Sequence, residues 1–548
     1  MPSSLPGSTN RMLTAMRTGH KLKKSPRGGR ITKFEAPFMP RPFLHNVGFL
    51  VLINLLIKPV FIFGIDMAVQ NRVGAAAYGN YFALFNFAFL FNVLLDFGIN
   101  NFNQRLVARD PKRVGLWLPN ILWVKAALTL AYVAAVFAVA AALGFDAAQL
   151  RLLGWIALGR VLVSFHMYFR SNVSGLQAFR TDAVLSVMDR LLTILLVGAL
   201  LYTPLMGRPF TVQDFVVGTA IALAATALVS FGALRRLSGP LRLAANQRLF
   251  RVVLKRAYPF ALLGVLMTLY NRVDGVMLER MLGADGDRQA GIYAAAYRLL
   301  DAGTMFAFLL AGILLPLLAR MRKKGQDVWP IVRTSARLLF AISATAAGIG
   351  IFYAQPLMHT LYRDADPYWG ATFALLIGGF VFNALVYVYG SLLTAESKLR
   401  GLNAIALAGV ALNIGLNLIL IPRDQARGAA LATLVTQGLV ALAHAGYAAR
   451  VFTWRRAMLR EAARMLGFGA VLVGGGLAIR LGLAFLPGEG PAAGMAGAEQ
   501  ASGWAAYGWL VGAGALGLIG LVAGLAFRLL DPRALLEEYR QGGMTKDT

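Results

Sequence analysis

Long apolar segments recur along almost the whole chain, and they restrict what it can fold into. A run of about 20 apolar residues is long enough to cross the hydrocarbon core of a bilayer as a helix. Lipid offers the backbone no hydrogen-bonding partners, so each crossing segment must satisfy its own amides and carbonyls. Charged residues make up only 14% of the 548 residues, compared with about 25% in soluble domains. The sequence therefore predicts an all-α integral membrane protein.

Fourteen segments have the length and apolar character of a transmembrane helix. We expect them at 43–65, 80–103, 115–142, 149–170, 183–203, 215–235, 257–279, 291–318, 333–354, 369–393, 401–421, 428–450, 465–485 and 504–527. The last two are rich in Gly and Ala, which let helix backbones approach closely in a membrane. An even number of crossings places both termini on the same side.

The net charge of +29 follows this topology. Loops that stay in the cytoplasm carry the excess of Lys and Arg. If the N-terminus is inside, basic clusters such as Arg235–Arg236 and Arg320–Lys324 all fall on the inner face, whereas the opposite loops hold slightly more acids than bases. We therefore expect a multi-pass protein of the plasma (inner) membrane with both termini cytoplasmic. The basic charge is explained by the membrane and its lipids, so nucleic acid is not an expected partner.

A repeated motif indicates two related halves. Gly79-Asn80-Tyr81 opens the second span, and Gly291-Ile292-Tyr293 opens the eighth. Six helices separate the two copies, which keeps their orientation in the membrane the same. The expected organisation is a disordered basic tail (1–42), a first six-helix lobe (43–236), a basic cytoplasmic linker (237–256), a second six-helix lobe (257–451), and two C-terminal spans with a cytoplasmic tail (452–548).

Several spans contain charged side chains, which cost about 3 kcal/mol each at mid-bilayer and usually face a cavity. The cations are Lys58, Lys125, Arg160, Arg190, Arg272, Arg298 and Arg480, and the acids are Asp96, Asp189, Asp274 and Asp301. Arg298 and Asp301 lie three residues apart on one helical face, so we predict an ion pair within that helix. Lys58, Lys125 and Arg160 have no acid within a helical turn.

The second span carries a polar stripe. Asn92, Asp96, Asn100 and Asn103 are spaced by four, four and three residues and would share one face of a continuous helix. Such residues either form hydrogen bonds between helices or line a hydrophilic cavity, and we favour the cavity. A cationic cavity suits an anionic ligand, above all phosphate, to which Arg and Lys supply charge-assisted hydrogen bonds.

Metal and thiol chemistry is not expected. The chain has no cysteine, and its five histidines show no clustered ligand spacing. We therefore predict no metal site and no resident cofactor.

Several segments resemble polysaccharide-type, lipid-linked oligosaccharide flippases of the MOP superfamily. The resemblance lies in NIGLNLILIP at 413–422, GAALAT at 428–433, RVG at 72–74, YGNY at 78–81, DFG at 96–98 and YPF at 258–260, together with the Asp274 region followed by the second G-x-Y motif. It implies a two-lobed transporter that works by alternating access on an undecaprenyl-diphosphate-linked oligosaccharide, for surface polysaccharides such as lipopolysaccharide. A polysaccharide polymerase and glycosyltransferases would be its partners.

Chemistry, rather than a motif match, selects the candidate site residues. We expect Lys58, Lys125, Arg160, Arg272, Asn92 and Asn100 to contact the diphosphate or sugar. Asp96 and Asp274 are the candidates for coupling to a proton or sodium gradient.

Other functions stay open at this stage. A lipid II flippase would have the same kind of cavity, and a multidrug-extrusion-type antiporter would share the fold. The antiporter should favour an acidic interior, whereas the charges inside the spans are in cationic surplus. A membrane-embedded glycosyltransferase or polymerase would need acidic catalytic groups or a sizeable extramembrane domain, so we do not expect an enzyme. A scaffold without transport activity does not account for the intramembrane cations.

Overall fold

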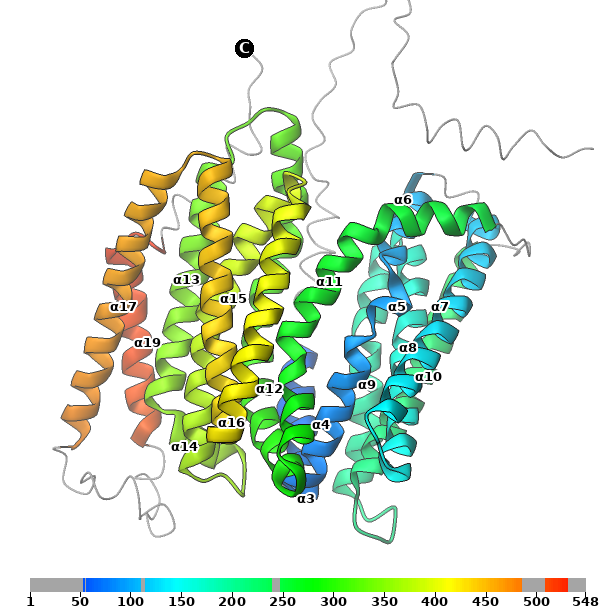
Figure 1. The fold of residues 1–548 in the computed structure, drawn as a ribbon, viewed down its shortest axis with the longest axis horizontal. Helices are drawn as coiled ribbons and strands as arrows, with labels where there is room; N and C mark the ends of the chain where they lie inside the picture. Colours follow the sequence, from blue (N-terminus) through cyan, green and yellow to red (C-terminus); the bar gives the residue numbers. More distant parts are fainter. Residues whose placement is uncertain (1–52, 55, 110–113, 239–246, 485–507, 531–548) are drawn as a thin grey trace, which may run out of the picture. The chain divides into compact units, whose positions relative to one another are not determined.

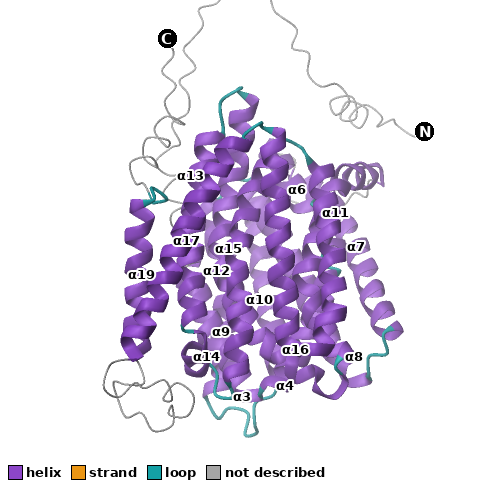
Figure 2. Ribbon diagram, turned by 60° about the vertical axis from the view of Figure 1, so that its left-hand side comes forward, coloured by secondary structure: helices purple, strands orange, loops and turns teal. Residues whose placement is uncertain are grey.

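The computed structural model of the chain describes residues 53–54, 56–109, 114–238, 247–484 and 508–530 (Figure 1). All described residues belong to one compact unit, which begins at His45. The predicted tail at 1–42 and the whole predicted loop before the last span (486–503) lie outside the described residues. Figure 2 shows that the described residues form helices joined by short loops, with no strand among them.

Every predicted span has a helical counterpart in the described residues. The spans of 43–236, which we call the first lobe, correspond to η1 (Ile62–Asp66) with α3 (Met67–Val73), α4 (Ala75–Leu90) with α5 (Val93–Asp96) and α6 (Ile99–Arg109), α7 (Val114–Ala142), α8 (Ala147–Gly175), α9 (Phe179–Tyr202) and α10 (Val212–Ser238). Those of 257–451, the second lobe, correspond to α11 (Gln247–Met281), α12 (Gly286–Lys323), α13 (Trp329–Phe352), α15 (Pro367–Ala395) and α16 (Leu399–Val451). Two short helices, η3 (Gly283–Asp285) and α14 (Ala354–Leu361), join second-lobe spans, and α17 (Arg455–Ala484) and α19 (Gly508–Ala526) complete the series.

Length and composition support membrane insertion. Ten of the helices in the described ranges are long and apolar enough to cross a bilayer. The longest, α16, has 53 residues and contains two of the predicted spans. They are separated by a kink, where the backbone leaves helical geometry at Asp424 and Gln425. The chain is therefore a multi-pass, all-α membrane protein, as predicted.

The second span is broken, and this corrects the prediction of one continuous helix with a polar stripe. Helix α4 ends at Leu90, and a single turn, α5, precedes the next break. Phe97 (φ 43°) and Gly98 (φ 75°) adopt left-handed backbone conformations there. Glycine accepts a positive φ without steric cost, and this allows the turn at mid-span. The polar residues of the predicted stripe consequently do not share one helical face.

The two lobes meet where α4 crosses α12. A methyl group at Gly79 would overlap the carbonyl oxygen of Asp287, and one at Gly291 would overlap that of Ala75. The contact is reciprocal, because each lobe contributes one glycine and one backbone carbonyl. Only glycine allows two helix backbones to approach this closely.

Hydrogen bonds between the lobes surround this crossing. Gln70 donates to the Gly291 carbonyl (2.9 Å), Asn71 to the Leu361 carbonyl (2.8 Å), Asn80 to the Asp287 carboxylate (3.2 Å) and Gln149 to the Glu279 carboxylate (2.9 Å). All four contacts lie at the end of the helix bundle that carries α3 and α14, the lower end in Figure 1. We call this end the sealed end.

The C-terminal helices pack beside the second lobe. Helices α17 and α19 contact each other, and both contact α13. A buried ion pair between Arg337 of α13 and Glu461 of α17 (2.6 Å) connects them. This pair lies outside the cavity described next, so its role is structural.

Candidate cavity for an anionic ligand

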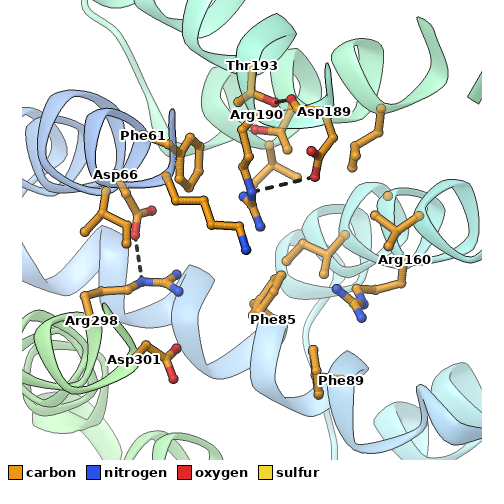
Figure 3. Close-up of a pocket in the computed structure, with 18 of the residues that line it drawn as sticks. Phe61, Asp66, Phe85, Phe89, Arg160, Asp189, Arg190, Thr193, Arg298 and Asp301 are labelled. Carbon is orange, nitrogen blue, oxygen red and sulfur yellow. Dashed lines mark hydrogen bonds and ion pairs between the residues drawn. The ribbon is translucent and has the colours of Figure 1, made fainter. Parts of the chain in front are cut away.

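A cavity of about 410 Å3 lies between the lobes, lined by residues of η1, α4, α8, α9, α10, α11, α12 and α15 (Figure 3). Its charged lining residues are the cations Lys58, Arg160, Arg190, Arg272 and Arg298 and the acids Asp66, Asp189 and Asp301. In the described part of the chain the lining thus has two more cations than carboxylates. This surplus gives the cavity a positive character.

Three of these cations are paired. Arg298 contacts Asp66 at 2.7 Å, Arg272 contacts Asp301 at 3.1 Å, and Arg190 contacts its neighbour Asp189 at 3.6 Å. Lys58 and Arg160 form no ion pair with any residue that the structure describes. The surplus charge is therefore assigned to two particular side chains, both from the first lobe.

The predicted ion pair between Arg298 and Asp301 within α12 is wrong. Arg298 instead pairs across the lobes with Asp66, which also accepts a hydrogen bond from the Tyr78 hydroxyl (2.8 Å). Asp66 is only 3% exposed, and a buried carboxylate needs a counter-charge more than a half-exposed one does. The predicted first span stopped one residue short of Asp66, so the sequence offered no reason to place this acid beside Arg298.

One aromatic ring contacts guanidinium groups from both lobes. The Arg160 guanidinium of α8 lies 4.4 Å from the centre of the Phe89 ring, and that of Arg272 of α11 lies 5.2 Å from it. Figure 3 shows Arg160 beside Phe85 and Phe89, across the cavity from Arg298. Cation–π contacts of this kind hold a guanidinium in place.

Two donors on these arginines have no partner. Arg160 donates one hydrogen bond from Nη2 to the Asn92 side chain (2.8 Å). Its Nε, and Nη1 of Arg272, are buried and make no hydrogen bond in the described structure. Buried donors are almost always satisfied, so these atoms mark the place where an anionic ligand would add bonds.

The cavity brings together some of the predicted ligands but not others. Lys58, Arg160 and Arg272 line it. Asn92 does not line it but accepts a hydrogen bond from Arg160. The remaining candidates, Lys125, Asn100, Asp96 and Asp274, are not among its lining residues. Asp96 instead accepts a hydrogen bond from the backbone amide of Asn100 (3.2 Å) and so caps the start of α6.

Sequence reasoning missed the aromatic part of the lining. Phe85, Phe89 and Trp155 contribute rings to the cavity. In a chain with 34 phenylalanines, nothing in the sequence separates these rings from lipid-facing ones.

Asp274 lies in a second polar cluster, inside the second lobe. Its carboxylate accepts hydrogen bonds from Tyr293 of α12 (2.7 Å) and from Asn417 (2.6 Å) and Thr433 (2.6 Å) of α16. Asp274 is fully buried, and Asn417 in turn donates to the Asn413 side chain (3.2 Å). The segments 413–422 and 428–433 therefore each direct a hydrogen-bond donor, the amide of Asn417 and the hydroxyl of Thr433, from the two halves of α16 to one carboxylate.

The described residues contain no group of three or more His, Cys, Asp or Glu side chains that could hold a metal ion. The Asp274 cluster has a single carboxylate, surrounded by the neutral donors Tyr293, Asn417 and Thr433.

Comparisons with known proteins agree with this architecture. A family model described as polysaccharide biosynthesis protein matches residues 43–322. No curated protein matches the sequence.

Solved transporters share the fold. A structure of the lipid II flippase MurJ in an inward closed conformation superposes with a TM-score of 0.63 at 12% identity, covering 89% of this chain and 100% of that one. A MOP-superfamily transporter from Pyrococcus furiosus, whose binding pocket is described as having reverse polarity, superposes with a TM-score of 0.54 at 14% identity. The match covers 75% of this chain and 94% of that one. An inward-facing multidrug resistance MATE transporter superposes with a TM-score of 0.55 at 14% identity, covering 77% of this chain and 98% of that one. At these identities the likeness establishes the fold.

Proposed function

Because this chain belongs to the family of polysaccharide biosynthesis proteins, we propose that it is a flippase that moves an undecaprenyl-diphosphate-linked oligosaccharide across the plasma (inner) membrane. The observation that carries the proposal is the pair of cavity cations without an acidic partner, Lys58 and Arg160. A diphosphate brings the negative charge that they lack. The product would serve the assembly of surface polysaccharide, upstream of a polymerase and downstream of glycosyltransferases.

Different lining residues of the cavity would bind different parts of the cargo. Lys58, Arg160 and Arg272 would hold the diphosphate through charge-assisted hydrogen bonds, which are about twice as strong as neutral ones. The rings of Phe85 and Trp155 would pack against the sugar, and the polyprenyl chain would stay in lipid. Arg272 keeps Asp301 as its ion-pair partner, so a bound diphosphate would compete with that carboxylate, and release would restore the pair.

Alternating access follows from the position of the sealed end. With both termini in the cytoplasm, the sealed end faces away from the cytoplasm, and the cavity is closed toward the outer leaflet. Cargo would enter from the inner leaflet in this state. Opening outward would then break the hydrogen bonds that Gln70, Asn71, Asn80 and Gln149 make across the lobes.

The Asp274 cluster would couple transport to an ion gradient. Its oxygen atoms suit a hard cation such as sodium, because hard cations take oxygen ligands, and its carboxylate could equally carry a proton. Asp96 is the second coupling candidate. In this structure it caps α6, so its protonation would loosen the break in the second span.

Lipid II is the second candidate cargo. It carries the same diphosphate and polyprenyl groups, and the lipid II flippase superposes on this chain over its full length. The cationic surplus counts against a multidrug-extrusion role, since cationic drugs would be repelled from this lining.

The experiment that tests the proposal is complementation of a deletion strain. The triple variant Lys58→Ala, Arg160→Ala, Arg272→Ala should reduce surface polysaccharide at least tenfold at equal protein level. Arg480→Ala is the matched control, because Arg480 is an intramembrane-segment cation that does not line the cavity.

Full complementation by the triple variant would overturn the cationic-cavity proposal. Loss of cell-wall integrity with normal surface polysaccharide in the deletion strain would favour lipid II as the cargo.

A further inference from the structure

Lys125 is a buried cation that the cavity does not use. It lies on α7, is 1% exposed, and contacts the Tyr168 ring at 5.7 Å. Its Nζ donates a hydrogen bond to the backbone carbonyl of Leu95 (3.0 Å). A lysine is expensive to place inside a membrane protein, so a buried lysine bonded to a backbone oxygen needs a reason.

The reason lies in the break of the second span. In a continuous helix the Leu95 carbonyl would accept the amide of residue 99. The left-handed conformations of Phe97 and Gly98 prevent this bond. Ser164 of α8 also donates to the same carbonyl (3.0 Å). Two side chains from two different helices thus replace the amide that the break removes.

The other end of the single turn α5 bonds to a cavity residue. Asn92, three residues before Leu95, accepts the hydrogen bond from Nη2 of Arg160 (2.8 Å). Arg160 is also the cavity arginine that has no acidic partner in the described chain. The short turn α5, which immediately precedes the break at Phe97 and Gly98, is therefore bonded to Lys125 and Ser164 at Leu95 and to Arg160 at its first flanking residue, Asn92.

We infer that Lys125 is a positioning residue: it holds the break in the second span, and through Asn92 it fixes the guanidinium of Arg160 for the anionic group of the cargo. The inference deepens the proposed function and rests on it for the identity of that group. Lys125 itself does not touch the cargo. Its removal should therefore matter only while Arg160 is present.

The first test measures Arg160 without any cargo. Phenylglyoxal modifies accessible arginines, and mass spectrometry of the full-length protein in nanodiscs gives a rate for each one. Lys125→Met should change the Arg160 rate about threefold or more, while the rate at Arg190, in the same cavity, stays within experimental error. Lys125→Arg, which keeps a charged donor, should restore the wild-type rate. An unchanged Arg160 rate in Lys125→Met would overturn the inference.

The second test is a double-mutant cycle with undecaprenyl diphosphate as the probe. Lys125→Met should weaken binding about tenfold in the wild-type background and less than twofold in Arg160→Ala, because coupled residues are not additive. An equal loss in both backgrounds would show general destabilisation and contradict the inference. If Lys125→Met does not fold, Ser164→Ala removes the other donor to Leu95 and serves in the same cycle.

The two tests separate the inference from the proposed function. A wild-type protein that does not bind undecaprenyl diphosphate would refute the proposed cargo, and the phenylglyoxal rates would still decide whether Lys125 positions Arg160. If the wild-type protein binds undecaprenyl diphosphate and Lys125→Met changes the phenylglyoxal rate of Arg160 but not that of Arg190, both the proposed function and the inference are supported.

Discussion

At the scale of single residues, the ion pairs of the cavity connect parts of the chain that are far apart in sequence. Arg298 of the second lobe pairs with Asp66 of the first, whereas the spacing along α12 favoured Asp301. Helical spacing describes neighbours on one helix, but a buried carboxylate from another helix competes more strongly. The charge that remains for a ligand therefore depends on the whole set of pairs.

Neutralising Asp66 should destabilise the protein. Asp66→Asn leaves the Arg298 guanidinium without its counter-charge, and breaking a buried pair costs about 3–5 kcal/mol. We expect a clear drop in the midpoint of thermal unfolding in detergent, measured by intrinsic fluorescence. The double variant Asp66→Asn, Arg298→Gln should recover part of the loss because no uncompensated charge remains. A single variant as stable as the wild type would contradict the ion-pair assignment.

At the scale of helices, the crossing of α4 and α12 depends on two glycines. Each lies against a backbone carbonyl, which cannot rotate away as a side chain can. The motif that identified the repeat in the sequence is thus also the point of contact between the lobes. Its packing role was not visible in the sequence, because a G-x-Y pattern does not reveal which helix faces it.

Alanine at either glycine should open the sealed end. Gly79→Ala or Gly291→Ala would push α4 and α12 apart and raise the exposure of Asn80. With Asn80→Cys as the sole thiol in this cysteine-free chain, a membrane-impermeant methanethiosulfonate reagent should react at least fivefold faster. Gly232→Ala is the matched control, since a methyl group there meets no atom within 4 Å. Equal rates in Gly79→Ala and Gly232→Ala would rule out this role for the crossing.

At the scale of the whole molecule, the membrane made most of the fold predictable. Hydropathy and loop charge locate the spans, because each must be helical and apolar along its own length. The break at Phe97 and Gly98 and the π-helix that ends at Asp66 are departures from that rule. Both are stabilised by partners on other helices, such as Lys125 and Arg298. Local periodicity in the sequence cannot identify those partners, because they lie on other helices.

The same reasoning explains the mixed result for the predicted site. Lys58, Arg160 and Arg272 were found because a cation inside a span is visible in the sequence. Lys125 met the same criterion but bonds to a backbone carbonyl. Spacing and composition do not distinguish a cation that faces a cavity from one that supports a broken helix.

Locking the sealed end should stop transport. Asn71 exchanges hydrogen bonds with the backbone at Leu361 and Arg363, so cysteines at positions 71 and 363 lie within reach of a short thiol cross-linker. Cross-linking Asn71→Cys, Arg363→Cys should abolish movement of the lipid-linked glycan in proteoliposomes, and a cleavable linker should restore it on reduction. Each single-cysteine variant is the control. Undiminished transport in the cross-linked protein would exclude alternating access through this end.

The pair between Asp66 and Arg298 has a consequence for the evolution of such proteins. Each residue belongs to a different half of the chain, so a change of charge in one half is tolerated only with a matching change in the other. Recombination between distant relatives at the linker would unite halves whose charges were selected separately. Chimeras joined there should fail more often than their sequence identity suggests, and restoring the opposite charge at the partner position should rescue them.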